Sequence, residues 1–98
     1  MKKYTKDSKV TIIGAGRLGG SLALALVNAS YNVKSIFSRN FNSSVNLSRK
    51  INNCFPSESI QKAVDNADVV FITTPDDAIS KTATSIKWVD GQAVIHCS

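Results

Sequence analysis

The feature that most constrains how this chain can fold is a glycine-rich turn, Gly14-Ala15-Gly16-Arg17-Leu18-Gly19, between two different apolar patterns. Before the turn, every residue from 10 to 13 is β-branched, which is typical of a strand buried on both faces. After it, apolar residues recur every three or four positions and predict an amphipathic helix that ends near residues 28–30. Its apolar side comprises Leu18, Leu22, Ala25, Leu26 and Ala29. The sequence therefore predicts a strand, a tight turn and a helix.

The rest of the chain keeps alternating between short apolar runs and helical patterns. We expect strands at 33–37, at 54–55 (closed by Pro56), at 69–73 and at 93–95. We expect helices at 43–51, at 60–67 after a cap at Ser57 or Ser59, and at 76–86. This alternation predicts a single α/β domain over 9–98, a doubly wound parallel sheet in three layers, after a basic tail at 1–8. No helix follows the fifth strand, so we expect an uncovered sheet edge and a domain truncated there.

Composition excludes several classes of protein. The 98 residues suffice for one core, and 43% hydrophobic with 19% charged residues is a globular composition. No apolar run is long enough to span a membrane. Cys54 and Cys97 lack the spacing of a metal site or a disulfide framework, so we expect no metal and a cytoplasmic protein with reduced thiols.

The net charge of +5 is concentrated at the N-terminus, where residues 1–9 hold four lysines and one aspartate, a net +3. No basic helix face with interleaved aromatic residues follows this segment, so nucleic acid is not an expected partner. The remaining +2 is compatible with an anionic small molecule.

The glycine turn has the spacing and the context of a dinucleotide site. Gly14 allows the tight turn, Gly16 lets a pyrophosphate approach the backbone, and Gly19 lets the helix lie close to the sheet. The free N–H groups and the helix dipole then face the anion. We predict that Ala15 and Leu18 take part with these glycines; Arg17 either contacts a phosphate or extends into solvent. A glycine-rich turn without a ligand is the alternative.

The end of the second strand indicates which dinucleotide binds. Arg39 lies 20 residues after Gly19, where NAD enzymes carry an acidic residue, and no acid occurs between Phe37 and Cys54. A guanidinium can bind a 2′-phosphate in a bidentate fashion, with Ser38 and Asn40 as further donors. The sequence therefore predicts NADP(H), unless Arg39 is merely an exposed residue after a strand. The missing acid also argues against a methyltransferase-like site for S-adenosylmethionine.

The fourth and fifth strands end at the same sheet edge. Thr73 and Thr74 are candidates to bond the nicotinamide ribose, with Pro75 fixing the loop, while Asp76 and Asp77 suit the start of the next helix. His96 is the candidate proton donor, although a lone histidine at a strand end is more often structural. No partner supports nucleophilic catalysis by Cys97 or Ser98.

Four segments together carry a family resemblance: 12–20, the run Phe37-Ser38-Arg39-Asn40, 74–79 with its Pro-Asp-Asp sequence, and the His96-Cys97-Ser98 strand end. Residues 9–98 resemble the Rossmann-like N-terminal domain of NADP-dependent oxidoreductases in the 6-phosphogluconate dehydrogenase-like superfamily, relatives of pyrroline-5-carboxylate reductase and deazaflavin-dependent NADP reductase.

The resemblance implies hydride transfer between NADP(H) and a small C=O or C=N substrate. It also implies a helical C-terminal domain that forms a homodimer and supplies much of the substrate pocket. This chain lacks such a domain, so we expect the 98 residues alone to be inactive. A non-catalytic module that binds or senses NADP(H) is the alternative.

Overall fold

The computed structural model describes residues 4–74 and 85–97. Their elements, in chain order, are β1 (Lys9–Ile13), α1 (Arg17–Asn28), β2 (Asn32–Phe37), α2 (Phe41–Ser48), β3 (Phe55–Ser57), α3 (Ile60–Asp65), β4 (Val69–Ile72) and β5 (Ala93–His96). Most of the helix expected at 76–86 lies outside the described residues. The predictions for Pro75, Asp76, Asp77 and Ser98 also fall on residues outside this range. Every other predicted element is present.

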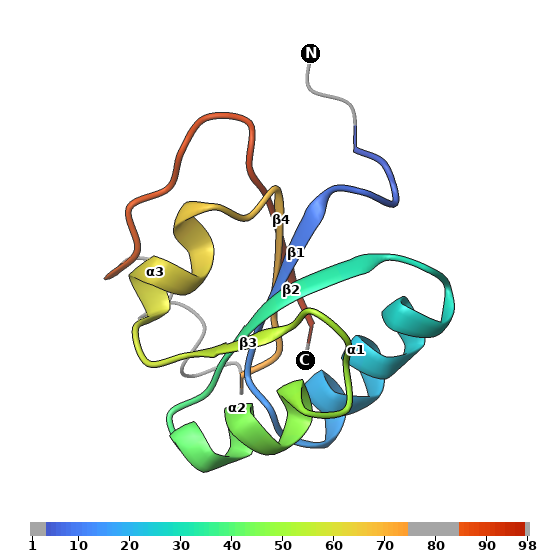
Figure 1. The fold of residues 1–98 in the computed structure, drawn as a ribbon. Coiled ribbons are helices and arrows are strands. Elements are labelled where there is room, and N and C mark those ends of the chain that lie inside the picture. The colour runs from blue at the N-terminus through green and yellow to red at the C-terminus, as the bar shows by residue number, and fades with distance from the viewer. Residues whose placement is uncertain (1–3, 75–84, 98) are drawn as a thin grey trace.

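The strands form one five-stranded sheet in the order β3-β2-β1-β4-β5, and each neighbouring pair is parallel. Helices α1 and α2 lie side by side, and α3 lies across the strands from them (Figure 1). This is the doubly wound, three-layer α/β fold that the alternating pattern predicts. In the described part of the chain, no helix has the length and apolar character needed to cross a membrane.

Each face of the sheet has its own core cluster. On the α1 and α2 side, Val10, Ile12 and Ile36 pack with Ala23 and Leu47. The cluster on the α3 side comprises Ile13, Val64, Ala67, Val70, Ile72 and Ile86, with Phe37, Ile60 and Trp88 packed against it. Alternation along β1 therefore sends Ile12 to one layer and Ile13 to the other, as a sheet covered on both faces requires.

Helix α1 packs on the sheet through a side that overlaps only partly with the one we expected, since Leu22 and Leu26 do pack against the core cluster. Leu18 is 43% exposed, and Ala25 is also exposed, whereas Gly19 and Ala23 are buried. The apolar spacing alone suggested a face centred on the leucines. Close packing of Gly19 against the turn at Gly14 rotates the helix, so that the Gly19 and Ala23 side faces the strands.

Two element boundaries also differ from expectation. Helix α2 begins at Phe41, two residues early, because the Asn40 side chain accepts a hydrogen bond of 3.0 Å from the Asn42 N–H and caps the helix. Strand β3 includes Pro56, which was expected to end it. Since β3 is the edge strand, the missing N–H of proline is tolerated there.

The first described residues pack against two other segments of the domain. The Tyr4 hydroxyl donates to the carbonyl of Gly91, and the Asn32 N–H donates to the Lys6 carbonyl over 3.2 Å. The described part of the basic N-terminal segment is therefore packed on the domain. At the opposite edge of the sheet from β3, Val94 and Ile95 of β5 are 37% and 41% exposed.

Candidate cofactor-binding site

The strand registers bring the predicted site residues to one edge of the sheet. Cα pairing aligns Phe37 with Ile13, and Ile13 with Ile72. The next residues along these three strands are Ser38, Gly14 and Thr73. The carboxyl ends of β2, β1 and β4 thus meet at the position where open α/β sheets bind their ligands.

The glycine turn is built around a threonine from β4. Gly14 has a φ of +109°, a conformation that favours glycine, and a Cβ at this position would lie 2.5 Å from Thr73 Oγ1. A Cβ at Gly19 would overlap the Gly14 carbonyl oxygen and would also lie 2.8 Å from Thr73 Oγ1. Both glycines are therefore required by close packing of turn, helix and strand.

Gly16 has a different reason to be glycine. A Cβ at Gly16 would have no heavy atom within 4 Å, so this part of the turn borders open space. Gly16 is the N-cap of α1, no side chain caps the helix, and the first turn contains no acidic residue. The first N–H groups of α1 thus form an uncapped, positively polarised helix end. Such an end fits a pyrophosphate.

An open groove of about 400 Å³ runs from this helix end between α1 and α2. Arg17 and Lys50 supply its positive charge, and Ser21 and Ser43 supply hydroxyl groups. A larger hollow of about 530 Å³ includes Tyr4, Lys6 and Tyr31 in its walls, but none of the predicted site residues. The groove, rather than the hollow, adjoins the glycine turn.

The end of β2 presents hydrogen-bond donors beside this turn. Arg39 is exposed, and within the described residues its side chain has neither an ion pair nor a hydrogen bond. The Asn40 side chain uses its oxygen to cap α2, which leaves the amide NH₂ as a donor. Ser38 Oγ accepts from the Asn40 N–H over 3.3 Å and keeps its own proton. All three residues thus retain donors for an anion.

The two threonines after β4 differ in their surroundings. Thr73 Oγ1 lies 3.0 Å from the Ile13 carbonyl oxygen and 3.2 Å from that of Gly14, and it donates to them. Thr74 Oγ1 is buried and has no hydrogen-bond partner in the part of the chain that the structure describes. A buried hydroxyl without a partner is costly, so Thr74 is suited to bond an incoming ligand.

Comparison with known proteins identifies the family to which the chain belongs. The family model described as "NADP oxidoreductase coenzyme F420-dependent" matches residues 9–98. The chain belongs to this NADP oxidoreductase family. No curated protein sequence gives a significant match.

Several solved structures share the fold of this family member. One from Bacteroides fragilis, provisionally described as an NADP oxidoreductase, has a TM-score of 0.79 at 23% identity; the match covers 95% of this chain and 36% of that protein. An imine reductase from a Pseudomonas species has a TM-score of 0.79 at 20% identity. The match covers 94% of this chain and 32% of that protein.

A reductive aminase from Aspergillus terreus, in complex with NADPH and ethyl levulinate, has a TM-score of 0.77 at 16% identity. The match covers 92% of this chain and 31% of that protein. The chain therefore spans about a third of the length of each of these three proteins.

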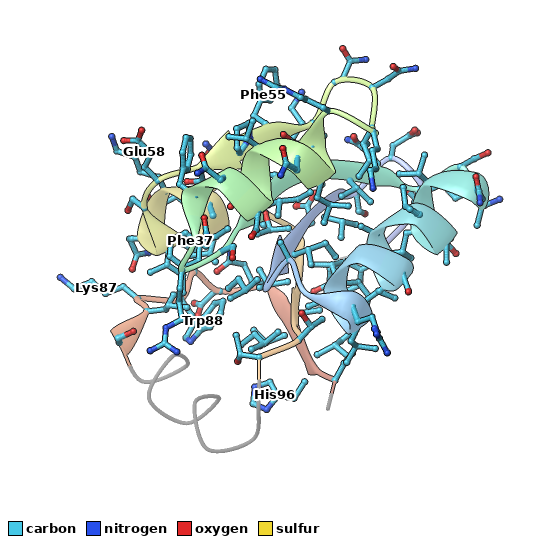
Figure 2. The ribbon with its side chains drawn as sticks, turned by 90° about the horizontal axis from the view of Figure 1, so that it is seen from below. Phe37, Phe55, Glu58, Lys87, Trp88 and His96 are labelled. Atoms are coloured by element: carbon cyan, nitrogen blue, oxygen red, sulfur yellow. The ribbon has the colours of Figure 1, made fainter. Side chains whose placement is uncertain are left out.

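His96 lies at the same sheet edge but apart from the glycine turn. It pairs with Ile72, so its side chain extends from the α3 side of the sheet, and it is exposed. Phe37 and Trp88 pack on the core cluster of that side, and His96 lies away from them (Figure 2). Its catalytic role stays a prediction.

Sequence reasoning missed the groove residues that α2 and the turn after it contribute. Ser43 and Asn46 share the side of α2 that faces α1, and Lys50, two residues after the helix, lines the same groove at the spacing i, i+3 and i+7. The spacing was visible in the sequence, but polar residues at that period usually indicate a solvent face. Only the packing of α1 beside α2 makes this side the wall of a groove.

Proposed function

We propose that this chain binds NADP(H) and forms the cofactor domain of an oxidoreductase acting on a C=O or C=N group of a small substrate. The observation that supports this most is the uncapped start of α1 at the glycine turn, next to the end of β2, where Arg39 has no ion pair among residues 4–74 and 85–97. No acidic residue occurs between Phe37 and Cys54. Membership of the NADP oxidoreductase family supports the same conclusion.

The pyrophosphate would lie against the turn at Gly16. The space beside that residue is open, and the helix end carries unpaired N–H groups and the positive end of the dipole. Arg17, the first residue of α1, is exposed on the wall of the adjoining groove and can neutralise one of the phosphate charges.

Arg39 would bind the 2′-phosphate of the adenosine ribose. A guanidinium forms bidentate, charge-assisted hydrogen bonds with phosphate, and Ser38 and Asn40 each keep a donor beside it. An acidic residue at this position would repel the doubly charged group. The electrostatics of this edge therefore favour NADP(H) over NAD(H).

The nicotinamide half would extend toward the ends of β4 and β5. Thr74 supplies a buried hydroxyl for its ribose, and His96 is the candidate to exchange a proton with the substrate. The cofactor supplies the hydride chemistry, so the protein's task is to hold and orient it. By resemblance, the substrate pocket and a homodimer contact belong to further helical sequence, and we propose a cytoplasmic location.

Calorimetric titration of the chain with NADPH and NADH tests the proposal. We expect NADPH to bind at least ~10-fold more tightly, the effect of one charge-assisted phosphate contact. Arg39→Ala should abolish this preference and leave NADH affinity unchanged. Arg49→Ala, which removes an exposed arginine at the other end of α2, is the matched control and should change neither affinity. Equal binding of both dinucleotides by the unmodified chain would contradict the proposal.

A further inference from the structure

The hydrogen bonds of Thr73 connect it to the end of β1 and to the glycine turn. Its N–H donates to the Ile13 carbonyl over 2.9 Å, and its hydroxyl reaches the carbonyls of Ile13 and Gly14 at 3.0 and 3.2 Å. A hydroxyl has one proton, which these two carbonyls share. The side chain of Thr73 is thus committed as a donor to the last residue of β1 and the first residue of the turn.

We propose that Thr73 is a positioning residue for the cofactor, acting through the peptide group that joins Gly14 to Ala15. The peptide bond between Gly14 and Ala15 is trans, so the N–H of Ala15 points away from the Gly14 carbonyl. Because Thr73 holds that carbonyl, the Ala15 N–H is directed away from β4. The hydroxyl therefore fixes which side of the turn presents donors.

The packing around the hydroxyl limits how the turn can respond to its loss. The space beside Thr73 Oγ1 is free only because Gly14 and Gly19 have no Cβ, which would lie 2.5 and 2.8 Å from this oxygen. Gly14 at a φ of +109° has few steric limits of its own. Without the hydrogen bond, the peptide after Gly14 can rotate and turn a carbonyl toward the phosphates, which repels them.

This inference rests on the proposed NADP(H) site and assigns Thr73 a role other than the ribose contact expected from the sequence. Thr73→Val replaces the hydroxyl by a methyl group of similar shape, whereas Thr73→Ser keeps the hydroxyl. Thr73→Val should raise the dissociation constant of NADPH ~10-fold, the effect of about one hydrogen bond, and Thr73→Ser should restore it to within about threefold of the original.

Adenosine 2′-monophosphate separates positioning from general damage. It keeps the phosphate that Arg39 would bind but has no phosphate for the glycine turn. Its affinity for Thr73→Val, measured by titration, should stay within about twofold of that of the unmodified chain. Unchanged NADPH binding by Thr73→Val, or a parallel loss of both ligands, would overturn the inference while leaving the proposed function intact.

Circular dichroism establishes that each variant is folded before binding is measured. If Thr73→Val does not fold, the smaller Thr73→Ala replaces it, with the same expected results. Failure of both variants beside a folded Thr73→Ser would assign the hydroxyl to fold stability and overturn a role in cofactor positioning. Absence of NADPH binding by the unmodified chain would overturn the proposed function, and this role with it.

Discussion

The backbone N–H of Gly14 donates a hydrogen bond of 2.7 Å to the carbonyl oxygen of Phe37. This contact joins the first residue of the glycine turn to the last residue of β2, two positions before Arg39. The turn suited to a pyrophosphate and the arginine suited to a 2′-phosphate are therefore held at neighbouring strand ends by the parallel ladder itself. The spacing between the two predicted phosphate sites is set by the sheet.

Gly16→Ala and Gly19→Ala should have opposite consequences. The methyl group at position 16 meets no protein atom, so the free energy of unfolding should fall by less than ~1 kcal/mol, while NADPH affinity drops at least ~10-fold because the methyl group occupies the phosphate side of the turn. At position 19 the methyl group would overlap the Gly14 carbonyl, and overpacking of this kind costs about 1–3 kcal/mol.

Urea unfolding and calorimetric titration of both glycine variants measure these two quantities. A stability loss at Gly16 as large as that at Gly19 would show that the turn is closed by protein atoms. Unchanged NADPH affinity in a folded Gly16→Ala variant would remove the pyrophosphate from this position.

Thr74→Val should weaken cofactor binding without weakening the fold. The Thr74 hydroxyl is buried and has no partner within the described residues, so its removal should leave the free energy of unfolding unchanged or raise it by about 1 kcal/mol. NADPH affinity should fall about fivefold if the ribose is its partner. Thermal unfolding with and without NADPH tests both effects, and a clear loss of stability without ligand would contradict the first.

Cys54 should react slowly with alkylating reagents. Burial raises the pKa of its thiol from 9.0 to about 11, against smaller opposing effects of the Phe55 backbone hydrogen bond and of Lys34. At pH 8 the thiolate fraction should be about 100-fold below that of an unperturbed thiol, since the fraction falls tenfold per unit. A Cys97→Ser variant isolates the reaction, and its rate should keep rising with pH to a midpoint near 11.

The same shift gives a sign for the pH dependence of stability. Between pH 9.0 and about 11 the unfolded thiol loses its proton before the folded one does, so the folded state binds more protons. The contribution of Cys54 to stability is therefore complete below pH 9.0 and declines as pH rises through this window. A Cys54→Ser variant should lose less stability than the unmodified chain over this range, and an equal loss would contradict the raised pKa.

The sequence predicted the sheet well because the apolar runs of a parallel sheet are short, continuous and closed by turn residues. It was partly wrong for the buried side of α1: Leu22 and Leu26 pack on the core as expected, but Leu18 is exposed and the fully buried residues are Gly19 and Ala23. A glycine carries no hydrophobic signal, yet here its close approach to Gly14 decides how the helix is rotated. That constraint lies between two elements and has no local signature.

The site was predictable where one segment forms it and less so where strands meet. The proposed roles of Gly14, Gly16 and Gly19 follow from their spacing, and the proposed role of Arg39 follows from its distance from them. The role of Thr73 depends on the register of β4 against β1, which places Thr73 beside Gly14. Sequence placed Thr73 at the correct edge but could not show that its hydroxyl bonds the turn.

The most direct test is the amide NMR spectrum of the chain, titrated with NADPH and with NADH. Both ligands should shift the amide signals of residues 14–19, and NADPH alone should strongly shift those of Ser38, Arg39 and Asn40. Shifts gathered instead around the hollow beside Tyr4 and Tyr31, or identical shifts at Arg39 with both ligands, would contradict a site built from the glycine turn and this arginine.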